Sequence, residues 1–346
     1  MRTLKILIRS PNWLGDAVMM LPAVEQMRKL HPDAHITLLI RENLVSLFQK
    51  SPLFDEVIGI QKRRDFFGFR RVYETAKILR KKNFDKGFLF TNSFSTAMEM
   101  FLGDVKKRYG FDRYARKRFL THPIKYDPKK WKARHHVETY QYIVDQDNTR
   151  EGKIPLFSLP KGVDFGGTQI PLQWLAENDL LVGFCPGAHY GPAKQWPLEY
   201  FQELKKSLIK EHHAKIVVFG TGSEENLAEA LSKDDPDHTI SLAGKTDTGQ
   251  LAGLIQRCRV MICNDSGVAH LSAALGVPTI VIFGSTDPKK TRPLGEHVSV
   301  FYESVRCSPC FRRTCPLSHD RYQCLLKIRP EHVLAQLKDI FKENAA

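Results

Sequence analysis

The chain has 346 residues, of which 42% are hydrophobic and 26% charged. This composition excludes intrinsic disorder, collagen and coiled coil, and the length predicts two domains of comparable size. No apolar run is long enough to span a bilayer, and residues 1–10 lack the features of a signal peptide. We therefore expect a cytoplasmic protein.

Positive charge is concentrated in one segment. The whole chain carries a net charge of +14, whereas residues 60–134 hold 22 Lys and Arg against 7 Asp and Glu, a net of +15. The remaining residues, 30 basic and 31 acidic, carry −1. This asymmetry favours an anionic partner, which could be a nucleic acid, an acidic membrane surface or a phosphorylated substrate. A solvated basic face without a ligand is the alternative.

The first half alternates short apolar runs with helical patterns. Strands are predicted at 4–8, 35–40, 56–60 and 84–90, and helices at 17–30, near Val45, at 72–81 and at 96–102. This alternation is typical of a parallel, doubly wound sheet. Residues 112–134 mix basic and aromatic side chains, and we expect a loop there.

The same rhythm returns after a stretch containing Gly and Pro at 154–172. Strands are predicted at 181–185, 215–219, 239–242, 260–263 and 279–283, and helices at 198–211, 224–231, 249–258 and 268–275. A closing helix is expected at 330–343, and packing against the first domain is one option for it. The repeat predicts an α/β fold of two Rossmann-like domains whose parallel sheets face a central cleft.

Two phosphate-binding signatures are incomplete. Ala243-Gly244-Lys245-Thr246 ends like a Walker loop, but Thr239 stands where that motif needs its first Gly. Gly220-Thr221-Gly222 begins like a dinucleotide fingerprint, but Glu225 occupies the position of the third Gly. A kinase and a conventional NAD enzyme are therefore disfavoured.

Three other strand-to-helix turns carry suitable chemistry. Asp16 follows the first strand, where it can either cap the first helix or accept a proton. The turn after 181–185 contains Gly187, Ala188 and Lys194, which suit close approach of the backbone to a phosphate and its neutralisation. A long surface loop is the alternative for that turn.

The turn after 260–263 reads Asn264-Asp265-Ser266-Gly267-Val268-Ala269-His270. Asp265 or Ser266 can cap the following helix, and backbone N–H groups at its start can bind a diphosphate. His270 lies one turn further along the same helix. The alternative is a capped helix with a buried His.

Taken together, these motifs resemble one family. Asn12-Trp13-Leu14-Gly15-Asp16, Lys194-Gln195-Trp196-Pro197, Ala243–Thr246 and Asn264–His270 stand in the order seen in the lipopolysaccharide heptosyltransferases, glycosyltransferase family 9. The resemblance covers nearly the whole chain and is strongest to members that modify the first heptose of the inner core, including the Cys-rich stretch after Arg306. It implies the GT-B fold, with an acceptor-binding domain, which we place at 1–170, followed by an ADP-sugar-binding domain at 171–346.

The resemblance also implies an activity. It is an inverting, metal-independent transfer of heptose from ADP-L-glycero-D-manno-heptose to the first heptose of the lipopolysaccharide inner core, without a cofactor. Asp16 matches the family's general base, and Lys194 matches the residue that neutralises the diphosphate. The donor-binding residues implied are Gly187, Ala188, Lys194, Glu224, Asp265, Ser266, Gly267 and His270. Glu224 would bind the adenosine ribose, with the adjacent Glu225 as the alternative.

The implied acceptor explains the basic segment. Kdo-lipid A carrying one heptose is acidic and lies at the cytoplasmic face of the inner membrane, so we expect peripheral contact with that surface. The candidate acceptor-binding residues are Lys62, Arg63, Arg64, Arg113, Arg116 and Arg118.

The seven cysteines form two groups. Cys185, Cys258 and Cys263 lie on or beside apolar strands and are expected to be small buried residues. Cys307, Cys310, Cys315 and Cys324 include a C-x-x-C pair, and their spacing is compatible with structural zinc. A redox-sensitive cluster and a packing feature are the alternatives.

Three other functions share some of these features. A related GT-B enzyme could use another nucleotide-sugar or acceptor, and a sugar-nucleotide epimerase shares the two-domain plan but needs no basic acceptor face. A nucleic-acid-binding module agrees with the pI of about 9.4, but the basic segment contains no recognisable reader motif. We therefore expect no nucleic-acid partner.

Overall fold

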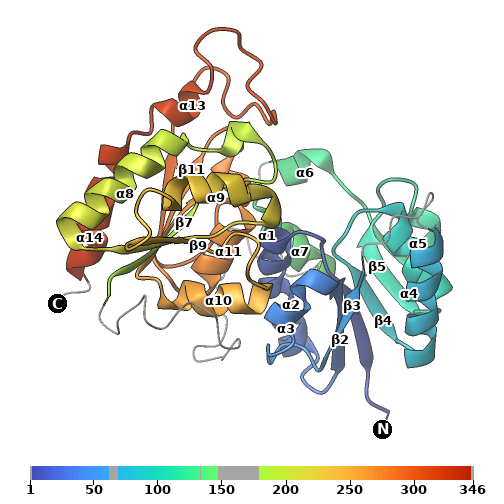
Figure 1. Ribbon diagram of the computed structural model, residues 1–346. Helices are drawn as coiled ribbons and strands as arrows, with labels where there is room; N and C mark the ends of the chain where they lie inside the picture. Colours follow the sequence, from blue (N-terminus) through green and yellow to red (C-terminus); the bar gives the residue numbers. More distant parts are fainter. Residues whose placement is uncertain (1, 62–68, 133, 147–178, 344–346) are drawn as a thin grey trace. The chain divides into compact units, whose positions relative to one another are not determined.

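The computed structural model describes residues 2–61, 69–132, 134–146 and 179–343 (Figure 1). The chain divides into two compact units, Met1–Phe157 and Ser158–Ala346. This division and the boundary expected at 170 both fall among residues 147–178, outside the described part. None of the described helices is long and apolar enough to cross a membrane.

The first unit is built on a six-stranded parallel sheet in the order β3-β2-β1-β4-β5-β6. Its strands are β1 (Lys5–Arg9), β2 (His35–Arg41), β3 (Glu56–Ile60), β4 (Lys86–Leu89), β5 (Lys107–Phe111) and β6 (His122–Ile124). Its α-helices are α1 (Leu14–Met19), α2 (Leu21–Leu30), α3 (Val45–Phe48), α4 (Phe69–Lys82), α5 (Phe94–Leu102), α6 (Pro128–Lys132) and α7 (His136–Val144). Two single 3-10 turns, η1 (Glu42–Leu44) and η2 (Lys117–Phe119), complete its described elements.

The second unit repeats this plan with the sheet order β12-β11-β10-β7-β8-β9. Its strands are β7 (Leu181–Cys185), β8 (Lys215–Val218), β9 (Thr239–Ser241), β10 (Val260–Asn264), β11 (Thr279–Phe283) and β12 (Val298–Tyr302). Its helices are α8 (Leu198–His212), α9 (Glu225–Ser232), α10 (Thr248–Arg257), α11 (Gly267–Ala274), α12 (Pro288–Thr291), α13 (Gln323–Leu326) and α14 (Pro330–Glu343). The 3-10 turns η4 (Pro192–Lys194) and η5 (Gly222–Glu224) follow β7 and β8.

Counted within its own unit, each sheet has the strand order 3-2-1-4-5-6, which is the Rossmann arrangement and confirms the predicted fold class. The order reverses between β1 and β4 in one sheet and between β7 and β10 in the other. In such sheets ligands bind beyond the carboxyl ends of the strands at this reversal point. The turns that follow β1, β7 and β10 are therefore the positions to inspect.

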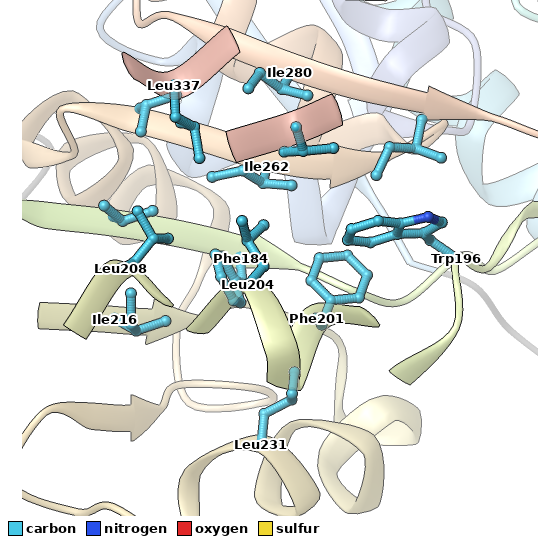
Figure 2. Close-up of a cluster of buried hydrophobic side chains, with 14 of the residues drawn as sticks. Phe184, Trp196, Phe201, Leu204, Leu208, Ile216, Leu231, Ile262, Ile280 and Leu337 are labelled. Atoms are coloured by element: carbon cyan, nitrogen blue, oxygen red, sulfur yellow. The ribbon is translucent and has the colours of Figure 1, made fainter. Parts of the chain in front are cut away.

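Apolar packing fixes these strands from both faces. In the second unit Phe184 and Ile262 of the central strands pack with Trp196 and Phe201 (Figure 2). The indole Nε1 of Trp196 donates to Ile328 O at 2.7 Å, which satisfies the polar atom of this buried ring. In the first unit Leu39 of β2 packs with side chains of α4 and α5.

The C-terminal helix belongs to the second unit. Val333, Leu337 and Ile340 of α14 are buried in the same cluster as Phe184, and α14 lies along α8 (Figures 1 and 2). Its apolar side chains are therefore used in the core of the second unit.

Two predictions for the first half need correction. The helix expected at 17–30 is two helices, because Pro22 near the start of α2 has no backbone N–H with which to continue the helix from α1. The loop expected at 112–134 contains η2, β6 and α6. β6 was missed because it has three residues and contains Pro123, which suits an edge strand.

Candidate functional site

The turn after β1 presents Asp16 in the first turn of α1. Trp13 occupies the N-cap in an extended conformation, so Asp16 is three residues inside the helix and is not its cap. The hydroxyl of Tyr140 on α7 donates to Asp16 Oδ1 at 3.3 Å. Burial, and then the negative charge of Asp16, raise the pKa of Tyr140 well above its ordinary value. Tyr140 therefore stays protonated at neutral pH and keeps donating to the carboxylate.

A buried ion pair supports this turn from behind. Arg9 Nε lies 3.2 Å from Glu99 Oε2, and neither side chain is more than 2% exposed. The same guanidinium donates to Asn12 Oδ1 at 3.3 Å. The Asn12–Asp16 turn is thus tied to α5, because Arg9 contacts both Asn12 and Glu99. Removing either partner of this buried pair would leave an uncompensated charge.

In the second unit the turns after β7 and β10 meet. Lys194 Nζ lies 2.5 Å from Asp265 Oδ2, with 13% and 5% of the two side chains exposed. The hydroxyl of Thr286 also donates to Asp265 Oδ2 at 2.5 Å. The Asp265 carboxylate is therefore occupied by Lys194 and Thr286, and it fixes the ammonium group at the carboxyl edge of the sheet.

Within the described part of the chain, neither of the two residues expected to cap α11 does so through its side chain: Asp265 pairs with Lys194 and Thr286 instead. Ser266 occupies the N-cap of α11, but its side chain accepts no capping hydrogen bond among the described residues. Gly267 is the first residue of the helix, and His270 is buried one turn later. The positive end of the helix dipole is thus located beside a lysine, which is a suitable environment for an anion.

Asn264 joins the two turns, a role that the sequence motif containing it does not indicate. Its fully buried side chain accepts from Trp196 N at 3.0 Å and donates to Pro186 O at 2.6 Å. Pro186 and Trp196 lie at the two ends of the loop that contains Lys194. The buried position and the two opposite hydrogen bonds suit an amide side chain, which supplies both a donor and an acceptor.

We expect Asn264→Ala to lower the free energy of unfolding by about 1–3 kcal/mol, because Pro186 O and Trp196 N lose their buried partner. Binding of ADP should weaken as well, since the Lys194 loop loses its tie to β10. Denaturant unfolding and ADP titration measure the two effects. Lys206→Ala, which removes an exposed side chain from α8 of the same unit, is the control for a general loss of stability. Unchanged stability would contradict this role of Asn264.

The two adjacent glutamates after β8 point to different turns. Glu224 Oε2 accepts from the backbone N and the hydroxyl of Thr221 at 2.8 and 2.9 Å. A Cβ at Gly187 would come within 2.0 Å of Glu224 Oε1, whereas a Cβ at Gly244 would come within 2.5 Å of Glu225 Oε1. Glu224 therefore lies against Gly187, where a Cβ would displace its carboxylate.

Among the predicted acceptor-binding residues, Arg116 needs correction. It is fully buried, and its guanidinium donates to Phe111 O, Thr91 O and Asn92 Oδ1 at 2.6, 2.5 and 3.0 Å. Burial lowers the pKa of Arg116 to about 10, which still leaves it protonated at neutral pH. Its donors are used to hold the loop after β5, so it is a structural residue.

The other basic candidates differ in position. Arg113 stacks on Tyr126, with its guanidinium carbon 3.9 Å from the ring centroid, and Arg118 is exposed beside Phe94 and Phe119. Lys62, Arg63 and Arg64 lie outside the described residues. Arg113 and Arg118 therefore remain candidates on the surface of the first unit.

The four clustered cysteines do not form a metal centre in the described residues, where no group of three or more His, Cys, Asp or Glu side chains could hold an ion. Structural zinc at these cysteines therefore stays a prediction. Cys324 is buried, and Cys307, Cys310 and Cys315 are all free thiols. Burial raises the pKa of the Cys324 thiol.

The cysteine-containing segment instead braces the Lys194 loop. Arg313 O accepts from Ala193 N at 3.0 Å, and Tyr190 donates to Phe311 O at 2.6 Å. These contacts hold the residue immediately before Lys194. No local pattern indicates these contacts, because both end on backbone carbonyls of a segment more than a hundred residues away in the chain.

Comparison with known proteins places these features in context. Residues 72–320 match the family model for glycosyltransferase family 9 (heptosyltransferase). Lipooligosaccharide heptosyltransferase 2 of Campylobacter jejuni is 30% identical over 99% of both chains, and lipopolysaccharide heptosyltransferase 2 of Escherichia coli is 27% identical over 99% of this chain and 100% of that one. The solved ADP-heptose lipopolysaccharide heptosyltransferase II of E. coli aligns with a TM-score of 0.82 and 25% identity, over 99% of this chain and 100% of that one.

Proposed function

The chain belongs to glycosyltransferase family 9, and we propose that it moves heptose from ADP-heptose to the first heptose of the lipopolysaccharide inner core. It is a glycosyltransferase of the GT-B fold, and the full-length likeness to proteins named heptosyltransferase 2 supports transfer onto the inner core. The observation that carries the proposal for the donor is the Lys194–Asp265 pair at the start of α11.

The second unit is proposed to bind ADP-heptose. Lys194 neutralises the diphosphate, and the amino-terminal end of α11, with Ser266 and Gly267, supplies backbone N–H donors to it. Asp265 holds Lys194 in place, and His270 lies within the same helix. Glu224, which lies against Gly187, is proposed as the ligand of the adenosine ribose, because a carboxylate accepts hydrogen bonds from two hydroxyls.

The first unit is proposed to bind the acceptor and to contain the base. Asp16 accepts the proton of the acceptor hydroxyl as the oxygen forms a bond to the anomeric carbon. The bond from that carbon to the phosphate oxygen breaks, and ADP leaves with the electron pair. Lys194 and the end of α11 stabilise the charge that develops on ADP, so protein groups take the role that a metal has in other transferases. A single displacement inverts the anomeric centre.

The acceptor is proposed to be Kdo-lipid A carrying one heptose, at the cytoplasmic face of the inner membrane. The net charge of +15 over residues 60–134 supports this, because each Lys or Arg near an anionic leaflet contributes roughly 1 kcal/mol. Arg113 and Arg118 are proposed to belong to this surface, together with Lys62, Arg63 and Arg64.

The donor assignment is tested with purified protein in EDTA, using ADP-heptose beside UDP- and GDP-sugars. We expect transfer from ADP-heptose alone, at a rate that EDTA does not change. Preference for a UDP- or GDP-sugar would contradict the donor assignment, and a loss of activity that added metal restores would contradict the electrostatic role of Lys194 and α11.

A further inference from the structure

Three arginines of the first unit gather at the carboxyl edge of its sheet. Arg9 ends β1, Arg41 ends β2, and Arg71 lies in the first turn of α4. In the sheet register Arg9 is opposite Leu39, and Arg41 follows two residues later. Because side chains alternate along a strand, Arg9, Leu39 and Arg41 project from the same face. This is the face against which α4 and α5 pack, since Leu39 shares a core cluster with Leu79 and Met100.

A single carboxylate pairs with two of these three cations in the described part of the chain. Glu99 of α5 is fully buried, and its oxygens lie 3.2 Å from Arg9 Nε and 3.5 Å from Arg71 Nε. Within the described part of the chain no other carboxylate forms an ion pair with Arg9, Arg41 or Arg71. Three positive charges against one negative charge leave a local excess of two, in a partly desolvated position where unpaired charge is costly.

Arg41 is the arginine of this cluster without a carboxylate partner among the described residues. Its guanidinium carbon lies 5.8 Å from the centroid of the Trp13 ring, which is 54% exposed. Burial, and then the positive charge of Arg71, lower the pKa of Arg41. The site therefore disfavours the charge of Arg41 until an anion arrives to compensate it.

The cluster adjoins the residues that hold Asp16. Trp13, which contacts Arg41, is the N-cap of the helix that contains Asp16, and Arg9 donates to Asn12 of the same turn. Arg71 also donates to Ser95 Oγ at 3.2 Å, at the start of α5. An anion bound by Arg41 and Arg71 would thus lie beside the turn that carries the proposed base.

We propose that Arg41 and Arg71 form an oxyanion subsite that binds a carboxylate or phosphate group of the acceptor and sets which hydroxyl reaches Asp16. Guanidinium groups suit this task because their planar donors match both oxyanions in a bidentate manner. Arg9 is buried and takes no part in binding; it pairs with Glu99, which also lies beside Arg71. This inference rests on the proposed function, because it assumes that the first unit binds the acceptor.

The test compares Arg41→Gln with wild type on three acceptors: the intact glycolipid, the same glycolipid with its carboxyl groups methyl-esterified, and a dephosphorylated form. On the intact acceptor we expect Arg41→Gln to raise KM about 10- to 100-fold, as loss of a charge-assisted hydrogen bond predicts, with kcat and ADP affinity nearly unchanged. Arg71→Lys should have a smaller effect, because it keeps the charge. Lys29→Gln, which removes an exposed charge from α2, outside the basic segment, should change KM less than twofold.

Wild type and Arg41→Gln should transfer heptose equally well to the acceptor that lacks the bound oxyanion. The loss of this oxyanion and the loss of Arg41 are then not additive. This result identifies the group as carboxylate or phosphate. Equal losses for Arg41→Gln on all three acceptors, or an effect of Lys29→Gln as large as that of Arg41→Gln, would overturn the subsite. Failure of the wild-type protein to transfer heptose to any acceptor would instead contradict the proposed function.

Discussion

Asp16→Asn should lower kcat about 100- to 10,000-fold while leaving the affinity for ADP nearly intact, because the amide has the shape of the carboxylate but cannot accept the proton. The side-chain oxygen of Asn can still receive the hydrogen bond from Tyr140. Asp16 is not the N-cap of α1, so the substitution should cost little stability. Steady-state transfer kinetics and an ADP titration provide the two measurements.

Asp104→Asn is a matched control for the Asp16 prediction, since it removes one exposed carboxylate from the same unit at a position with φ of 56°, which Asn also adopts readily. It should leave transfer unchanged. A folded Asp16→Asn protein with near-normal turnover would remove Asp16 from the chemistry. Loss of ADP binding in that variant would place it in the donor site instead.

Lys194→Ala should impair donor binding and catalysis together. The ammonium meets the phosphates in both the ground state and the transition state, so the Kd of ADP should rise about 10- to 100-fold and kcat should fall as well. The substitution also leaves the Asp265 carboxylate, 5% exposed, without its cation and facing the diphosphate. Repulsion between the two anions adds to the loss. Calorimetry with ADP and transfer kinetics measure both effects.

Two variants make the Lys194 result specific. Lys194→Arg keeps the positive charge and should recover part of the ADP affinity. Lys245→Ala removes an exposed lysine of the Walker-like turn, and it should leave the Kd of ADP within about twofold of wild type, because exposed charges contribute little. Normal ADP affinity in Lys194→Ala would contradict the assignment of the diphosphate to this loop.

Much of the fold could be predicted because its strands are apolar and regularly spaced. The predicted strands 56–60, 181–185 and 279–283 agree with β3, β7 and β11, since short buried runs between turn residues leave few alternatives. β5 and β12 escaped prediction. β5 begins Lys107-Arg108 and β12 is an edge strand whose residues are only half-buried, so neither has the apolar run of a central strand.

The candidate site was predictable where each residue sits on a strand-to-helix turn, because turns at the carboxyl edge of a parallel sheet hold ligands. That reasoning selected Lys194 and Asp265 separately. Their pairing depends on β7 and β10 being neighbours, which no local pattern indicates. The role of Arg116 could not be predicted, because nothing in the sequence of a basic loop indicates that one of its arginines is buried against backbone carbonyls.

The most direct measurement is the mass of the acceptor glycolipid after incubation with ADP-heptose and purified protein, wild type beside Asp16→Asn. Heptose transfer with Asp16 as the base predicts that wild type adds the mass of one heptose to a glycolipid that already carries one. Asp16→Asn should add almost none, although it binds ADP as wild type does. Addition of one heptose by both proteins at similar rates would contradict the mechanism, and addition by neither would contradict the activity.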